Sequence, residues 1–242
     1  MLTSHAEEYL EAIYRLGGQA EPVAMSDLAG RLSFSAASVN EMVRRLEEQD
    51  LVSYTPYRGV LLREEGLAQA LSVVRRHRLW ERFLTDLLGL PWDVVHEEAC
   101  RLEHAASEEI TERLAVLLDH PQYCPHGRPM PAPGRELASA PRAVPLVDLQ
   151  AGQRGRVVYV EREDPELLRY LDQLQIRPSA EIVVQQIAPF EGPMTICVDE
   201  TATFTYQVSL LDGSNVPVEI IELLDDNGTP DDTGDDFSPA GV

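Results

Sequence analysis

Apolar side chains recur every three or four positions through most of the first 118 residues, which is the spacing of amphipathic helices. The first such stretch begins at Ser4, whose spacing from Glu7 is that of a capping box, and it ends before Gly17 and Gly18. Further helices are predicted at about residues 26–32, 36–49, 65–87 and 92–106. The N-terminal half is therefore predicted to be mainly helical.

A short β-hairpin interrupts this series of helices. Residues 51–55 and 59–62 form two apolar runs that flank Pro56, Tyr57 and Arg58, so a turn is expected between them. Three helices followed by a hairpin are the element order of a winged helix-turn-helix, whose third helix enters the major groove of DNA. The sequence thus predicts a DNA-binding domain over residues 1–74.

The third helix has an apolar side and an opposite side of small and polar residues. Small residues let a helix approach base edges, asparagine pairs with adenine, and arginine suits phosphate or guanine. Winged helices also mediate protein contacts, and arginines often only solvate a helix surface, so a protein-binding role stays open. The residues expected to contact DNA are Ser35, Ala37, Ser38, Asn40, Arg44, Arg45 and Arg58.

The pattern changes after the helical residues 75–121, which are expected to form a second domain. Residues 122–145 are rich in proline and glycine and predict a linker. Residues 146–224 contain short runs rich in Val, Ile and Thr, which predict a small SH3-like β-barrel, and the aspartate-rich residues 225–242 predict a disordered tail. The predicted fold class is α+β, mainly α.

Composition narrows the function classes. The 242 residues carry 41 acidic and 20 basic side chains, a net charge of −21 that argues against general affinity for nucleic acid. All the basic residues are arginine, which suits bidentate contacts. Three scattered cysteines predict reduced thiols, and without an apolar run of bilayer length or a secretion signal a cytoplasmic protein that does not enter a membrane is expected.

Side chains that bind metal ions cluster on three predicted helices. His77 and Glu81 are four residues apart and so share one helix face. The next helix carries His96, Cys100, Glu103 and His104 within a sector of about 100°, and the first helix adds Glu8 and Glu11 on one side. Each residue taken singly also fits an ordinary structural role. Together they predict a divalent-cation site built from separate helices.

A hydrolytic site is the alternative interpretation of this region. The segment from His96 to Cys100 resembles the His-Glu-x-x-His motif of zinc proteases, in which the glutamate activates water. A cysteine replaces the second histidine, and Glu97 is expected to point away from the other ligands. The cluster therefore favours a non-enzymatic metal site over a metal-dependent hydrolase; metal storage or a scaffold role is a third hypothesis.

The chain resembles the diphtheria toxin repressor family of metal-dependent transcription repressors over about residues 3–225. The resemblance is carried by the stretch from Arg76 to Leu90, by residues 96–104, and by Cys124-Pro-His-Gly-Arg-Pro-Met-Pro. It implies a homodimer that binds palindromic operator DNA and represses metal-transport genes. It also implies one metal site formed by Glu8, Cys100, Glu103 and His104 and a neighbouring site formed by His77, Glu81 and His96.

The resemblance mixes two branches of the family. Iron-type members carry methionine at position 8 together with a cysteine at position 100, whereas manganese-type members carry a carboxylate at both. Glu8 and Glu11 favour Mn²⁺ as cofactor, while Cys100 suits Fe²⁺, and Zn²⁺, Co²⁺ or Cd²⁺ are possible substitutes. In longer members two polar residues of the SH3-like domain complete the neighbouring site, and alignment places Glu163 and Glu166 there; an acidic loop is the alternative.

Overall fold

The computed structural model describes residues 2–132, 143–189, 192–200 and 202–206, together with the backbone of 218–224. It consists of two compact units. The first unit contains the described residues up to Cys124 and residues 129–132. The second unit contains Pro125–Arg128 and the described residues from 143 onward. The predicted tail at 225–242 and residues 133–142 of the predicted linker lie outside the described residues.

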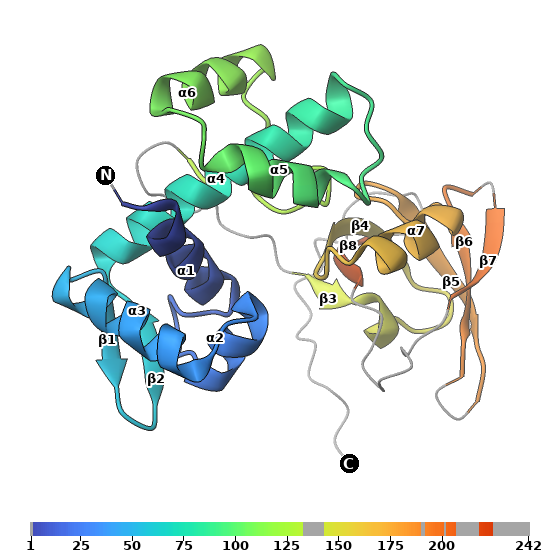
Figure 1. Ribbon diagram of the computed structural model, residues 1–242. Helices are drawn as coiled ribbons and strands as arrows, with labels where there is room; N and C mark the ends of the chain where they lie inside the picture. Colours follow the sequence, from blue (N-terminus) through green and yellow to red (C-terminus); the bar gives the residue numbers. More distant parts are fainter. Residues whose placement is uncertain (1, 133–142, 190–191, 201, 207–217, 225–242) are drawn as a thin grey trace. The chain divides into compact units, whose positions relative to one another are not determined.

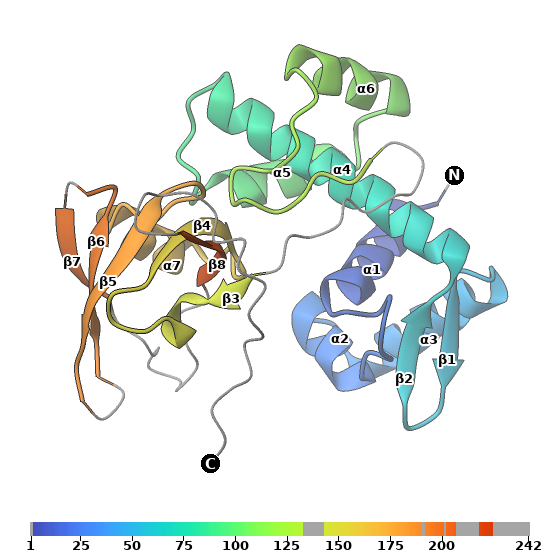
Figure 2. The same cartoon turned by 180° about the vertical axis from the view of Figure 1, so that it is seen from behind.

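The first unit contains the predicted helices and hairpin (Figure 1). Helix α4 is the longest element, and α1 lies beside it in both views (Figures 1 and 2). Helix α5 is shorter than the predicted 92–106, because it begins at Val95 and ends at Glu103 with His104 as its C-cap. The elements are α1 (Ser4–Arg15), α2 (Met25–Leu32), α3 (Ala36–Glu48), β1 (Val52–Thr55), β2 (Gly59–Leu62), α4 (Glu64–Asp86), α5 (Val95–Glu103) and α6 (Glu108–Leu117).

The helix caps agree with the sequence at α3 but not at α1. Ser35 caps α3, and its hydroxyl accepts the backbone N–H of Ser38 at 3.2 Å. The prediction of Ser4 as the cap of α1 is wrong, because Thr3 takes the extended conformation and its hydroxyl accepts the N–H of Ala6 at 3.3 Å. The side chain of Glu7 is therefore available for contacts with other helices.

The amphipathic pattern of the N-terminal helices reflects a shared core. Leu10 and Ile13 of α1 and Leu46 of α3 have no solvent exposure and pack in one cluster with the hairpin residues Val52 and Val60. Burying each such side chain contributes about 2 kcal/mol to folding. This packing fixes the face of α1 that carries its glutamates.

Residues 129–131, although part of the predicted linker, pack against α4 within the first unit. The Arg75 guanidinium donates to the carbonyl of Pro131 at 3.3 Å, and the Arg78 guanidinium donates to the carbonyl of Pro129. Met130 is buried against Leu79. Composition predicted the absence of regular structure here but not this docking.

The second unit is an antiparallel β-domain, as predicted. Its sheet has the strand order β3-β8-β4-β5-β6-β7, and α7 begins at a cap in which the Asp164 carboxylate accepts two backbone N–H groups. The α+β fold class is confirmed, and none of the described helices is long and apolar enough to span a bilayer. The elements are β3 (Val144–Pro145), a 3₁₀ turn (Leu146–Asp148), β4 (Arg154–Val160), α7 (Pro165–Gln173), β5 (Glu181–Ile187), β6 (Met194–Val198), β7 (Ala202–Tyr206) and β8 (Val218–Leu224).

Candidate metal centre

The predicted ligands of the neighbouring site lie together in the first unit, two of them buried and His96 partly exposed. His77 and Glu81 of α4 are completely buried, and the His77 Nε2 atom lies 3.0 Å from Glu81 Oε1. The same nitrogen lies 3.0 Å from His96 Nδ1 of α5, which is 3.5 Å from Glu81 Oε1. Two imidazoles and one carboxylate thus face one another, as the spacing along α4 and α5 predicted.

Glu103 connects this group to the other predicted site. Its carboxylate is 2% exposed, with one oxygen 2.7 Å from His77 Nδ1 and the other 3.2 Å from His104 Nε2. Burial acts to raise the pKa of Glu103, but hydrogen bonds from His104 and His77 outweigh it and lower the pKa to about 2. The hydrogen bonds to Glu103 and Glu7 in turn raise the pKa of His104 to about 10.

Neighbouring side chains also shift the pKa values of His77 and Cys100. Burial acts to lower the pKa of His77, but the charge of Glu81 and the hydrogen bonds with Cys100 and Glu103 raise it well above its ordinary value. Burial acts to raise the pKa of the Cys100 thiol, but His77 and His96, 3.9 and 3.8 Å from its sulfur, lower it. The thiol is therefore biased toward the thiolate, which is the form that binds metals.

These pKa shifts predict acid sensitivity of the metal-free protein. Because the folded pKa of Glu103 is depressed, its contribution to stability is complete above the unfolded value of 4.5 and is lost as pH falls toward 2. His104, whose pKa is raised, does not titrate in this range. In EDTA, lowering the pH from 5.5 to 3.5 should remove about 1 kcal/mol of the free energy of unfolding through Glu103 alone.

Urea unfolding at the two pH values measures this loss. Glu103→Gln should lose about 1 kcal/mol less than the wild type over the same interval, whereas Glu97→Gln, an exposed change on the same helix, should behave as wild type. An equal loss in the wild type and Glu103→Gln would contradict the account.

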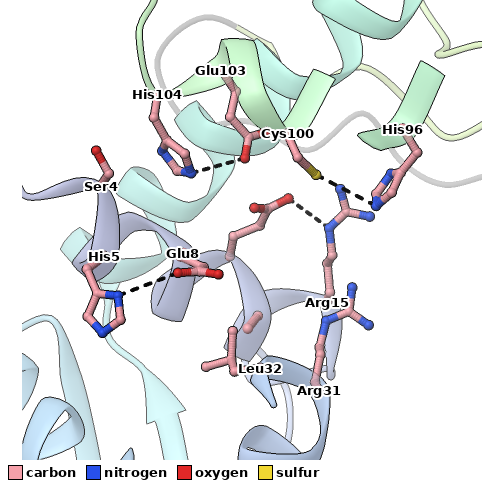
Figure 3. Close-up of a pocket in the computed structure, with 12 residues that line it drawn as sticks. Ser4, His5, Glu8, Arg15, Arg31, Leu32, His96, Cys100, Glu103 and His104 are labelled. Atoms are coloured by element: carbon pink, nitrogen blue, oxygen red, sulfur yellow. Dashed lines mark hydrogen bonds and ion pairs between the residues drawn. The ribbon is translucent and has the colours of Figure 1, made fainter. Parts of the chain in front are cut away.

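The predicted ligands of helix α1 line a pocket together with the predicted ligands of α5. Glu8 and Glu11 line a pocket of about 710 Å³ together with His96, Cys100, Glu103 and His104 (Figure 3). An oxygen of Glu11 lies within 4.8 Å of ligand atoms of His77 and Glu103. Glu11 also accepts a hydrogen bond from Arg15 Nε at 2.8 Å, and Glu8 lies 3.6 Å from His5. Both helices therefore contribute to one pocket, as predicted.

Glu7 contacts the pocket residue His104, an interaction that the sequence did not predict. One of its oxygens lies 2.9 Å from His104 Nδ1 and 2.8 Å from Arg76 Nη2. Burial acts to raise the pKa of Glu7, but His104 and Arg76 outweigh it and lower the pKa. The Arg76 Nε also donates to the carbonyl of Glu103 at 2.9 Å, so Arg76 joins α4 to α1 and α5.

The chemistry of the site fits a divalent cation. Carboxylates, imidazoles and a thiol converge from three helices, and this donor set suits Mn²⁺, Fe²⁺ or Zn²⁺. Glu11 is paired with Arg15, Glu103 lies between two histidines, and Glu8 lies 3.6 Å from His5, so a basic side chain lies beside each of these carboxylates.

Glu163 and Glu166, the two carboxylates predicted to complete the neighbouring site, belong to the second unit. Glu163 lies 3.9 Å from Nδ1 of the buried His126, and Glu166 is exposed in the first turn of α7. Their participation in the neighbouring metal site stays a prediction. Cys124 and His126 are both buried.

The predicted DNA-contacting residues are all exposed on α3, at its cap and on the hairpin. The Ser35 and Ser38 hydroxyls lie 2.9 Å apart, and Asn40 donates to the carbonyl of Ala36 at 2.9 Å. Arg45 pairs with Glu41 on the same helix. The arrangement leaves the outer face of α3 polar and accessible, as a recognition helix requires.

Three family profiles match consecutive parts of the chain. The N-terminal DNA-binding domain of iron-dependent repressors matches residues 1–60, and the metal-binding and dimerisation domain of the same repressors matches residues 63–132. The FeoA domain matches residues 144–207. The order of domains agrees with the order of the two structural units.

Individual relatives show the same similarity. The iron-dependent repressor IdeR of Mycobacterium tuberculosis is 35% identical over 198 residues, covering 76% of this chain and 85% of the relative. The diphtheria toxin repressor of Corynebacterium efficiens is 34% identical over 231 residues, covering 88% of this chain and 99% of the relative. The structure of a manganese-dependent transcriptional repressor in complex with manganese superposes with a TM-score of 0.78 at 32% identity, covering 89% and 99% of the two chains.

Proposed function

We propose, from the premise that this chain belongs to the iron-dependent repressor family, that Mn²⁺ is the cofactor with which it represses metal-transport genes. The family assignment makes the chain a metal-dependent transcriptional repressor that binds a divalent cation and operator DNA and forms a homodimer. We further propose that Mn²⁺ is the native metal and that the operator is palindromic. The proposed domains are residues 1–74, 75–121 and 146–224. The observation that supports it best is the pocket shared by α1 and α5.

In the proposal, two groups of side chains hold metal. One consists of Glu8 and Glu11 from α1 with Cys100, Glu103 and His104 from α5 and its C-cap, which line one pocket. The neighbouring group consists of His77, Glu81 and His96, with Glu163 and Glu166 as proposed additions. These residues would hold a divalent cation, which would supply positive charge to the carboxylates of α1 and α5.

Side chains of α1, α4 and α5 also connect the DNA-reading helices with the dimerisation helices. Glu7 bonds to Arg76 of α4 and to His104, so α1 is fastened to both helices. The buried Glu103 holds His77 and His104 in defined orientations through its two oxygens. Fixing α1 fixes α3, because the two helices share a core. Operator binding then follows as a population shift toward one arrangement of the two recognition helices in the dimer.

The balance of donors favours Mn²⁺ over softer ions in this proposal. Carboxylates predominate over the single thiol, and Mn²⁺ prefers oxygen ligands. If the Cys100 sulfur is a ligand, Cys100→Asp should improve the affinity for Mn²⁺ relative to Co²⁺ on the order of tenfold, because oxygen replaces sulfur. Competition titrations with a chelating dye measure both affinities. Equal changes for the two ions would show that the sulfur is not a ligand.

The hydrolase hypothesis is not retained, because the family consists of transcriptional repressors rather than enzymes. Glu97, the residue that would activate water, is exposed and is not among the residues that line the metal pocket. Storage or scaffold roles would give metal binding without duplex affinity. Measuring DNA binding separates these roles from the proposal.

Fluorescence anisotropy with a labelled palindromic duplex tests the proposed function. The duplex is selected from a random pool by the wild-type protein in Mn²⁺, and binding is measured in Mn²⁺, in Fe²⁺ without oxygen, and in EDTA. Tight binding in Mn²⁺ that EDTA reverses and that His104→Ala abolishes is the expected result. Equal affinity under all conditions would refute a metal-dependent repressor activated through these residues.

A further inference from the structure

The turn at the tip of the hairpin holds an aromatic residue where the backbone favours a different residue type. The Arg58 N–H donates to the carbonyl of Thr55 at 3.0 Å, with Pro56 in the second position of the turn and Tyr57 in the third. Tyr57 has φ of +66°, the left-handed region. A proline followed by positive φ matches a type II turn, in which glycine or asparagine is preferred at the third position. The tyrosine side chain therefore carries a conformational cost.

The Tyr57 ring is not buried in the core of the domain. It is the most exposed large apolar side chain among the described residues, with a relative exposure of 108%. The tip points away from α4, α5 and α6 in both views (Figures 1 and 2). A strained and fully exposed aromatic residue is a candidate for contact with a partner.

The hairpin presents this ring on a firm support. The backbones of Val23 and Val60 exchange two hydrogen bonds of 2.8 and 2.9 Å, which fasten β2 to the loop before α2. Gly59 allows this approach, because a Cβ there would lie 2.1 Å from the Val23 carbonyl oxygen. The position of Tyr57 relative to the recognition helix is thus set by the folded domain.

We propose that Tyr57 contacts the operator directly, packing its ring against a deoxyribose and donating its hydroxyl to a phosphate. The proposal rests on duplex DNA being the partner, as in the proposed function. Arg58, the adjacent exposed residue, is the expected ionic contact at the same tip. One phenolic hydroxyl cannot distinguish base pairs as a bidentate arginine or asparagine does, so the contact carries affinity rather than sequence preference.

The negative net charge of the chain makes an uncharged contact with DNA useful for affinity. A net charge of −21 opposes approach to DNA, and only ionic contacts weaken strongly as salt rises. An uncharged aromatic contact adds affinity that salt does not screen. Tyr57 and Arg58 are therefore expected to differ in the salt dependence of their contributions.

The test compares the full-length wild type with Tyr57→Ala, Tyr57→Phe, Tyr57→Asn and Arg58→Ala in saturating Mn²⁺. Anisotropy titrations use the selected palindromic duplex and an unrelated duplex of equal length across a range of salt concentrations. Tyr57→Ala should weaken binding to both duplexes on the order of tenfold without changing the salt slope, and Tyr57→Phe should weaken it about threefold. Arg58→Ala should reduce the salt slope by about one.

Thermal unfolding separates this role from a structural one. Tyr57→Asn should raise the melting temperature by about 2 °C, because asparagine tolerates positive φ, while it weakens DNA binding as Tyr57→Ala does. Unchanged DNA affinity of Tyr57→Ala, or loss on the palindromic duplex alone, would overturn the proposal. If the wild type itself shows no Mn²⁺-stimulated binding, the proposed function fails and the role of Tyr57 falls with it.

Discussion

Replacing Glu103 by glutamine should reduce Mn²⁺-dependent operator binding by on the order of 100-fold, equivalent to about 3 kcal/mol, the cost of removing one partner from a buried charged pair. Glu103 is almost completely buried, and its two oxygens lie beside His77 and His104. Glutamine keeps the shape but presents an amide N–H₂ group to imidazoles that carry protons of their own. It also removes a negative charge from the pocket that is proposed to bind the cation.

Calorimetric titration with Mn²⁺ and anisotropy titration with the operator duplex measure this effect. Glu97→Gln is the matched control, since it makes the same substitution on an exposed position of the same helix and should leave both affinities unchanged. Circular dichroism of both variants separates a loss of folding from a loss of binding. A folded Glu103→Gln variant with wild-type Mn²⁺ dependence would remove Glu103 from the proposed site.

Replacing Leu10 by alanine should lower the free energy of unfolding by about 3 kcal/mol, because the side chain is completely buried and its removal leaves a cavity. Leu10 lies in the core shared by α1, α3 and the hairpin. A looser core would no longer hold α3 in a fixed position relative to α1 and its glutamates. Operator affinity should therefore fall as well.

Ile13→Val provides a graded comparison, because Ile13 is equally buried on the same helix but loses only one methylene group. It should lose about 1 kcal/mol. Urea unfolding in EDTA, followed by circular dichroism, measures both variants. Equal stability of Leu10→Ala and Ile13→Val would show that the Leu10 side chain does not fill a tightly packed core.

Local sequence signals predicted α1 to α5, the hairpin and most of the residues in the candidate site. The third helix follows from Ser35 and its apolar stripe, and the hairpin follows from the turn residues between two apolar runs. His77 and Glu81 were predicted to share a face because a helix brings residues four apart together, and the structure places them 3.0 Å apart. These features depend only on neighbouring residues.

Features that depend on how the helices pack could not be predicted in this way. Glu7 is bonded to His104, 97 residues later in the chain, and only the packing of α1 on α4 and α5 decides this. Thr3 and Ser4 both carry a hydroxyl that can cap a helix, and Thr3 is the cap because its backbone is extended. The docking of Pro129 and Pro131 on two arginines of α4 likewise leaves no signal in composition.

Anomalous X-ray diffraction from crystals grown with Mn²⁺, collected at the manganese absorption edge, would locate bound ions directly. The account predicts a peak bonded to a carboxylate from α1 and to side chains at positions 100–104, and a second peak at His77, Glu81 and His96. Peaks with no ligand from α1 would contradict the claim that a cation joins the DNA-reading domain to the dimerisation helices.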